Sequence, residues 1–282
     1  MGQCAHSFFG SVLMRKAFFL FCLYLSQAIY SQPIQDHQID LEALAELASY
    51  LHIPTGENLI EETQRRWLRR AGQERWDMAE LSSEQRQFVL DWAEREGFFA
   101  PWKPLERSYD KALILGATTG HMRMRLEFLK QLWEEGVRFK EVVWLTGERP
   151  LDPRVDQLLE RCANESEAAR VLWEELEPAS DMRKLPVLFV SVPMKEEGNM
   201  LKRPNTMDTI VAWLEQDPEP CKALFISTQP FCGYQFAVIK SGLPQEFLFD
   251  VAGPGANPST HPAAAAITLD CVARWIYQGN LP

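Results

Sequence analysis

Two short apolar runs of the chain end in residues whose side chains and backbone could hold a ligand. The first lies within 111–116 and continues as Gly-Ala-Thr-Thr-Gly, and the second lies within 222–228 and ends in Ser-Thr, followed by Gln. In an open α/β sheet, ligands bind beyond the carboxyl ends of the strands, where the N–H groups of helix starts can reach them. The two runs therefore indicate where a ligand would bind, without identifying it.

The residue types at these strand ends favour a polar or anionic ligand. Hydroxyl groups, an amide and an arginine at helix starts can together hold a phosphate or a carboxylate. Either Arg123 or Arg125 supplies the charge, because the sequence does not tell which side chain points inward. The candidate ligand-binding residues are Gly116, Thr118, Thr119, His121, Arg123, Arg125, Asn205, Thr206, Asp208 and Thr228. A competing interpretation is that Thr119, Asn205 and Thr228 are only helix caps and turn formers.

No motif identifies a catalytic centre. The chain has no GxGxxG segment and no GxSxG segment, so neither the dinucleotide fingerprint nor the nucleophile elbow is present. It has no CxxC pair and no Cys/His cluster, and its acidic residues lack a known metal-ligand spacing, so we expect no metal site. His261 precedes a proline, which is more typical of an exposed helix start than of a catalytic base. Whether the protein is an enzyme is left open.

Alternating strand and helix patterns over residues 105–282 predict an α/β domain. The apolar runs are nearly continuous, which is typical of a sheet covered on both faces. We expect strands at 111–116, 140–146, 186–192, 222–228 and 246–251, and helices near 121–136, 153–176 (a broken helix), 205–216, 231–242 and 262–278. This order predicts a Rossmann-like, doubly wound, mostly parallel five-stranded sheet. The strands at 111–116 and 222–228 should lie in its middle.

Residues 38–104 are predicted to form a small helical segment that ends in a stiff Pro-Trp-Lys-Pro linker. Leu44, Leu47 and Leu51 recur at helical spacing, and a later capped helix begins at Ser82 or Ser83. We interpret the tryptophans of this segment as core packing. The basic cluster at 65–70 is interpreted as a solvated helix face, because acidic residues flank it.

The overall charge argues against a nucleic-acid partner. The chain carries 29 Lys and Arg against 39 Asp and Glu, for a formal net charge of −10. Binding to nucleic acid through phosphates needs concentrated Lys and Arg instead.

Residues 1–31 have the pattern of an export signal. Arg15 and Lys16 precede an apolar run over 17–25, and cleavage is expected after Ala28 or Ser31. The run is far shorter than the ~20 residues that cross a membrane as a helix. Met14 is an alternative start. We therefore expect the mature protein to be exported, to the periplasm or another extracytoplasmic compartment.

Four cysteines remain after the predicted signal, namely Cys162, Cys221, Cys232 and Cys271. An oxidising compartment would allow three pairings among them. Buried free thiols fit the sequence equally well.

The order of the segments over 108–255 resembles the YdcF/SanA/ElyC-like domain family of bacterial envelope-associated proteins. The matching segments are Leu115-Gly116, Arg123 or Arg125, Leu145-Thr146-Gly147, Glu167-Ala168-Ala169, Asn205-Thr206-Met207-Asp208-Thr209 and Ser227-Thr228. The family has Glu-Asn where this chain has Asp208-Thr209, and a His and an Arg approximately where it has Phe231 and Tyr234. The resemblance implies a Rossmann-like fold, a role in or near the envelope and a nucleotide-type ligand such as S-adenosylmethionine. An exported protein has poor access to S-adenosylmethionine, and the residues alone identify no cofactor.

Two functions from different classes follow from these observations. The first is an enzyme, or a degenerate enzyme, that binds a small polar or anionic ligand at the strand ends. The second is a non-catalytic scaffold of the envelope that binds a protein partner. The strand-end residues favour the first, and the replacement of the family's His and Arg favours the second.

Overall fold

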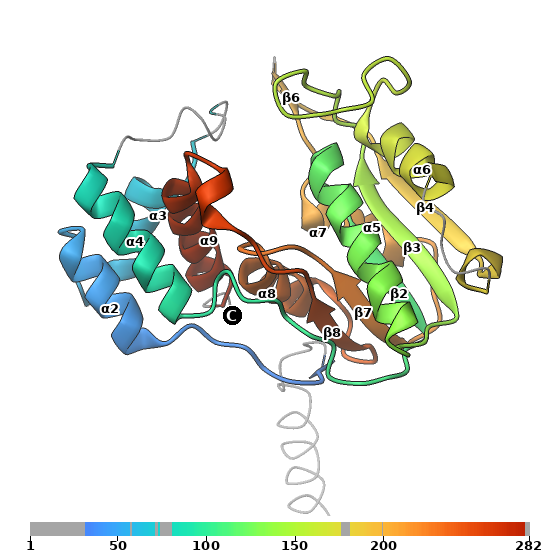
Figure 1. Cartoon of the computed structure of the whole chain (residues 1–282), viewed down its shortest axis with the longest axis horizontal. Coiled ribbons are helices and arrows are strands. Elements are labelled where there is room, and N and C mark those ends of the chain that lie inside the picture. Colours follow the sequence, from blue (N-terminus) through green and yellow to red (C-terminus); the bar gives the residue numbers. More distant parts are fainter. Residues whose placement is uncertain are drawn as a thin grey trace, which may run out of the picture.

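The computed structural model describes residues 32–56, 58–70, 73, 81–175, 181–198 and 200–279, so the predicted export signal lies outside the described residues. Its central sheet has the order β1-β8-β7-β2-β3-β4, and all neighbouring strands are parallel (Figure 1). The strands are β1 (Gln32–Pro33), β2 (Lys111–Leu115), β3 (Glu141–Gly147), β4 (Val187–Val192), β7 (Lys222–Ile226) and β8 (Leu248–Ala252).

All five predicted strands are present, and the prediction that β2 and β7 lie in the middle of one parallel sheet is confirmed. The sequence analysis did not predict β1, which adds a sixth strand beside β8 at the edge of the sheet. Two residues are too few to show an alternating pattern. An edge position also suits Pro33, which has no N–H group to donate to a second neighbour.

Helices cover both faces of the sheet, as the apolar strands predicted. They are α5 (Thr119–Glu134), α6 (Glu165–Glu175), α7 (Thr206–Leu214) and α8 (Cys232–Gly242), while α9 (Ala264–Gly279) packs against α8 and the helical segment. Side chains of α5 and α6 form one buried cluster with the sheet, and side chains of α7 and α8 form another on the opposite face. The result is the three-layer arrangement of a Rossmann-like fold.

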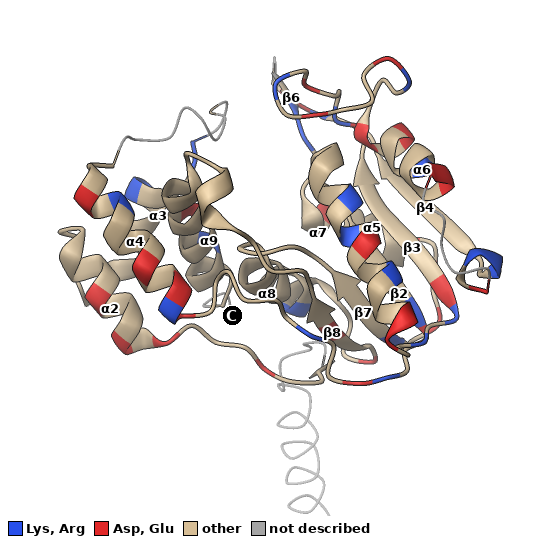
Figure 2. Cartoon of the chain, in the orientation of Figure 1, with Lys and Arg blue, Asp and Glu red and all other residues tan. Residues whose placement is uncertain are grey.

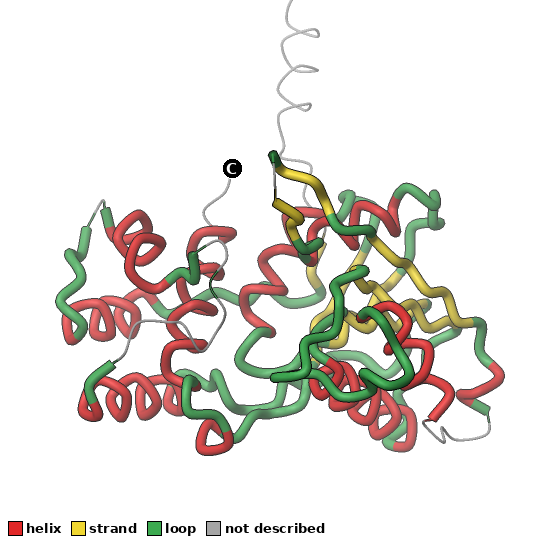
Figure 3. The backbone as a smooth tube through the Cα atoms, turned by 90° about the horizontal axis from the view of Figure 1, so that it is seen from above, coloured by secondary structure: helices red, strands yellow, loops and turns green. Residues whose placement is uncertain are grey.

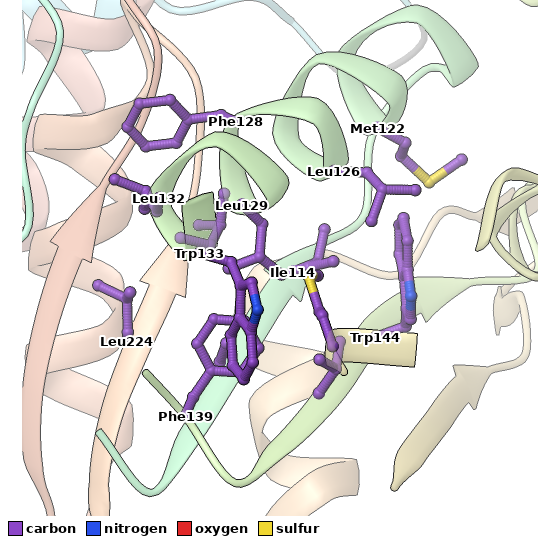
Figure 4. Close-up of a cluster of buried hydrophobic side chains, with 14 of the residues drawn as sticks. Ile114, Met122, Leu126, Phe128, Leu129, Leu132, Trp133, Phe139, Trp144 and Leu224 are labelled. Atoms are coloured by element: carbon purple, nitrogen blue, oxygen red, sulfur yellow. The ribbon is translucent and has the colours of Figure 1, made fainter. Parts of the chain in front are cut away.

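Helix α5 shows why its sequence folds against the sheet. Met122, Leu126 and Leu129 recur at helical spacing and are at most 1% exposed. They pack above Ile114 of β2 and Trp144 of β3, as Figure 4 shows. This packing fixes the start of α5 just beyond the end of β2.

The broken helix predicted near 153–176 is helical only over α6, and the irregular first half has a physical reason. Residues 153–164 form turns, because the Asp156 carboxylate accepts a hydrogen bond from the Asp152 N–H (2.9 Å) and draws this segment into a loop. Helix α6 begins only after Asn164, whose side chain accepts the Glu167 N–H (2.9 Å).

The predicted helical segment is formed by α2 (Leu41–Tyr50), α3 (Leu59–Trp67) and α4 (Ser83–Arg95). Ser82 and Gln85 make the expected capping box at the start of α4. The core of this segment contains Trp67 and Trp92, and α9 provides the other half with residues such as Val272. Helices α2, α3, α4 and α9 therefore gather on one side of the molecule, and the central sheet with its flanking helices lies on the other (Figure 3).

An antiparallel hairpin, β5 (Lys195–Glu197) with β6 (Met200–Lys202), lies between β4 and α7. The residues of β5 are exposed and pair with β6. Gly198 allows the turn, since its φ of +61° lies in the region that favours glycine. Leu201 on the hairpin is 65% exposed.

Charged residues lie mostly in the helices and loops, while the strands carry few along their length (Figure 2). No helix within the described ranges is long and apolar enough to cross a membrane. Of the cysteines that the structure describes, Cys162, Cys221, Cys232 and Cys271 are free thiols.

Candidate functional site

A cavity of about 1740 Å³ opens beyond the carboxyl ends of the central strands. On one side it is lined by the ends of β2 and β3, the loop before α7 and the start of α8. On the other side it is lined by α3 and α9. This is the place where ligands bind in open parallel sheets.

The structure brings together part of the set of candidate residues at this cavity. Those that line it are Gly116, Thr118, His121, Arg125, Asn205 and Thr206. Those outside its lining are Thr119, Arg123, Asp208 and Thr228. The second group has other partners, which explain their positions.

Thr119 and Thr228 are buried and hold neighbouring segments in place. The Thr119 N–H donates to Asp156 Oδ1 (2.9 Å), and the Thr119 hydroxyl accepts the Gln157 N–H (2.7 Å). The Thr228 hydroxyl accepts a hydrogen bond from Arg125 Nη2 (3.3 Å). Both residues therefore support the walls of the cavity from behind.

The two candidate arginines of α5 point in different directions. Arg123 pairs with Glu175 of α6, with Nη2 and Oε2 2.9 Å apart, and so joins two helices away from the cavity. Arg125 is only 2% exposed and donates through Nη1 to the carbonyl oxygens of Leu115 (2.6 Å) and Gly116 (2.9 Å). Of these two arginines, Arg125 is the one that places its positive charge at the end of β2.

His121 lies at the start of α5 and faces the start of α8. Its Nδ1 is 2.8 Å from the hydroxyl oxygen of Thr118, and its ring meets the Phe231 ring edge-on with centroids 5.5 Å apart. Phe231 and Tyr234 both line the cavity. They give this part of the wall an aromatic surface.

The start of α7 presents an amide to the cavity. Asn205 and Asp208 form a reciprocal capping box: the Asn205 side chain accepts the Asp208 N–H (3.1 Å), and the Asp208 carboxylate accepts the Asn205 N–H (2.9 Å). Asp208 also pairs with Lys195 of the hairpin, with Nζ and Oδ1 2.5 Å apart. Asn205 therefore caps the helix and also lines the cavity.

Replacing Asn205 with alanine should lower the free energy of unfolding by about 1 kcal/mol, because the helix loses its cap. Urea denaturation would measure this loss. Ser82→Ala, which removes the corresponding cap of α4 away from the cavity, is the matched control with a similar cost. A stability of Asn205→Ala equal to that of the wild type would contradict the capping role.

A buried ionic network that the sequence analysis missed forms the floor of the cavity. Arg149 Nη1 donates to Asp156 Oδ2 (2.7 Å), and Arg149 Nε donates to Glu165 Oε2 (3.2 Å). The other oxygen of Glu165 accepts the Gly147 N–H (3.3 Å). These side chains are at most 10% exposed. The network ties the end of β3 to the following loop and to the start of α6.

The two carboxylates of this network respond differently to burial. Burial opposes the ionisation of Asp156, but Arg149 and the N–H groups of Asp152 and Thr119 outweigh it and hold the pKa below its ordinary value. For Glu165 burial is the larger effect, and it raises the pKa of the carboxyl against the opposing charge of Arg149. Arg149 is thus the cation on which both buried acids depend.

Glycine at position 116 allows the end of β2 to pack closely against the ionic network. A Cβ atom on Gly116 would lie 2.8 Å from the carbonyl oxygen of Leu145 and would clash with the Glu165 carboxylate. The end of β2 can therefore approach β3 and α6 closely only without a side chain at this position.

The charge of the cavity wall is opposite to that of the whole chain. Among the described residues, the arginines that line it are Arg69, Arg125, Arg149, Arg154, Arg203 and Arg274, and the carboxylates are Asp152, Glu165 and Asp270. The arginines remain in excess when Asp156, which lies behind Arg149, is included. The whole chain has a net charge of −10.

Most of these arginines lie outside the segments in which the sequence suggested ligand contacts. Arg149 and Arg154 belong to the irregular loop after β3, and Arg203 follows the hairpin. Arg69 belongs to the cluster that was interpreted as a solvated helix face. That interpretation fits Arg65 and Arg66, which pair with Glu62, whereas Arg69 lines the cavity. The hint in the sequence was the Glu-Arg pair directly after the Thr-Gly end of the second strand.

Fold and site together define a Rossmann-like α/β protein with an arginine-lined cavity at its strand ends. No known family model matches the chain, and no curated protein or solved structure matches it.

Proposed function

We propose that this protein binds a small organic anion, a phosphate or a carboxylate, in the cavity at the ends of its strands. The excess of arginine in the wall of a strongly acidic protein carries this proposal. A concave site lined by one sign of charge concentrates ligands of the opposite sign. Guanidinium groups also match the geometry of phosphate and carboxylate oxygens.

The arginines have different parts in this function. Arg125 is buried and held by hydrogen bonds to neutral groups, so it contributes a fixed positive potential, whereas Asp156 and Glu165 offset the charge of Arg149. Arg154 and Arg203 are exposed on the cavity wall and can reach a ligand directly. Asp152 pairs with Arg154 and holds it near the wall. The hydrogen bonds from Arg154 keep the pKa of Asp152 well below the ordinary value. Asn205, at the start of α7, supplies an amide beside them.

The double variant Arg154→Gln, Arg203→Gln should bind phenyl phosphate at least about tenfold more weakly than the wild type, because each charge-assisted hydrogen bond contributes ~1.5–3 kcal/mol. Isothermal titration calorimetry would measure the affinity. The control is Arg161→Gln, Lys202→Gln, which removes the same charge outside the cavity wall.

Equal affinity in the two double variants would contradict the proposal, because general charge rather than the cavity would then control binding. If phenyl phosphate fails to bind the wild type at any concentration up to several millimolar, the anion-binding function is wrong. That result would favour the alternative, a scaffold that binds a protein partner.

The proposal includes export to an extracytoplasmic compartment and a divergent relationship to the YdcF/SanA/ElyC-like family. Arg15, Lys16 and the apolar run at 17–25 support export, and the order of segments over 108–255 supports the relationship. We assign no catalytic residue, since the positions of the family's His and Arg hold approximately Phe231 and Tyr234.

N-terminal sequencing of the mature protein should find that it begins near Ile29 or Gln32, after removal of the signal. Recovery of a cytosolic protein that retains residues 15–28 would show that the export proposal is wrong.

A further inference from the structure

The cavity is larger than one small anion requires. Its volume of about 1740 Å³ exceeds the ~300–1,000 Å³ of ordinary small-molecule sites. It extends from the strand ends, with Arg154 and Arg203, to the helical side of the molecule, with Arg69 and Arg274. The volume alone therefore suggests a ligand with more than one recognised part.

The helical side of the cavity has a polar surface that hydrogen bonds hold in place. Arg274 binds Asp270 through two hydrogen bonds, of 2.8 and 3.0 Å, and the Arg69 N–H donates to the same carboxylate (2.9 Å). Gln64 of α3 donates to the carbonyl oxygen of Ala273 (2.6 Å). These contacts fix α3 against α9, and they place the side chains of two arginines, Arg69 and Arg274, in the cavity wall on this side.

An apolar wall separates the two arginine groups. Helix α8 packs against both α7 and α9 and lies between them (Figure 1). Phe231 and Tyr234 at the start of α8, with Ile267 of α9, belong to one apolar cluster and line the cavity. A ligand that reaches from one arginine group to the other must pass this wall.

We infer that the ligand is an extended molecule with an anionic group at each end and an aromatic or apolar segment between them. This inference rests on the proposed anion-binding function and adds a second anion subsite at Arg69 and Arg274. The first anionic group meets Arg154 and Arg203, the middle packs on Phe231 and Tyr234, and the second group meets Arg69. Two linked groups gain affinity because binding of one raises the effective concentration of the other.

Calorimetry with two kinds of probe tests this inference. The probes are phenyl phosphate and a series of bisphosphates whose phosphate groups are joined by aromatic spacers of increasing length. At least one bisphosphate should bind the wild type about tenfold or more tightly than phenyl phosphate does. Arg69→Gln should remove this advantage and leave the affinity for phenyl phosphate unchanged.

Arg70→Gln is the matched control, because it removes the same charge from the neighbouring residue, which does not line the cavity. It should retain the full advantage of the bisphosphate. If phenyl phosphate binds but no spacer gives an advantage, the second subsite is wrong and the proposed function stands. The same conclusion follows if Arg69→Gln keeps the advantage. If neither kind of probe binds, both the function and the inference are wrong.

Discussion

Replacing Arg149 with methionine is expected to lower the free energy of unfolding by about 3–5 kcal/mol at pH 7, because two buried carboxylates lose the cation that is hydrogen-bonded to them. Arg149 serves both Asp156, whose side chain is 0% exposed, and Glu165, at 10%. Methionine fills much of the same space but leaves both carboxylates buried without this cation. Urea denaturation of the two proteins would measure the difference.

The pH dependence of this loss distinguishes the ionic effect from a packing effect. In the wild type Arg149 lowers the pKa of Asp156, so this stabilisation is present above the ordinary Asp value of ~4 and is lost as the pH falls through the lower folded value. In the variant the lowering effect of Arg149 on the pKa of both acids is lost, so they take up protons at higher pH than in the wild type. The difference in the free energy of unfolding between the wild type and Arg149→Met should therefore decrease as the pH falls from 7 to 5.

Arg161→Met is the control for Arg149→Met. Arg161 also pairs with a carboxylate, that of Glu175, but its side chain is 52% exposed. Its replacement should cost less than about 1 kcal/mol, with little dependence on pH, since exposed ion pairs contribute little. Similar losses in the two variants would contradict the role of burial.

Gly116→Ala is expected to destabilise the protein by roughly 1–3 kcal/mol, because the added methyl group overpacks the floor of the cavity. The new Cβ would meet the Leu145 carbonyl oxygen at 2.8 Å and displace the Glu165 carboxylate. Loss of the contact between Glu165 and Arg149 should also weaken binding of phenyl phosphate. Thermal denaturation and calorimetry would measure the two effects.

Gly120 provides a sharp control for this prediction. It lies four residues later, in the first turn of α5, and a Cβ atom there would meet nothing within 4 Å. Gly120→Ala should therefore be neutral or stabilise the protein by up to ~1 kcal/mol, because alanine has the higher helix propensity. A destabilisation equal to that of Gly116→Ala would show that close packing at position 116 is not the cause.

The sheet could be predicted because its strands are buried on both faces. Ala112, Leu113, Ile114 and Leu115 of β2 are all at most 1% exposed, and a continuous apolar run records that burial directly in the sequence. No comparable pattern in the sequence indicates that α9 packs against the helical segment. Val272 and Ile276 mark an amphipathic helix, but periodicity does not name the surface on which the helix packs.

The site was predictable only where the residue type and the local element are tightly linked. Asn205 and Gly116 could be predicted because a helix start and a strand end favour these residues. Arg149 and Glu165 are separated by an irregular loop, and their contact depends on how that loop folds over the strand ends. The choice between Arg123 and Arg125 likewise depended on the rotation of α5 against the sheet.

The proposed position of the anion can be observed directly. Diffraction data collected at the tungsten edge from crystals soaked in tungstate, a heavy analogue of phosphate, would locate the bound ion. The account predicts an anomalous peak inside the cavity, within contact distance of Arg154 or Arg203 and close to Asn205. Tungstate bound only on the outer surface, with the cavity free of it, would contradict the account.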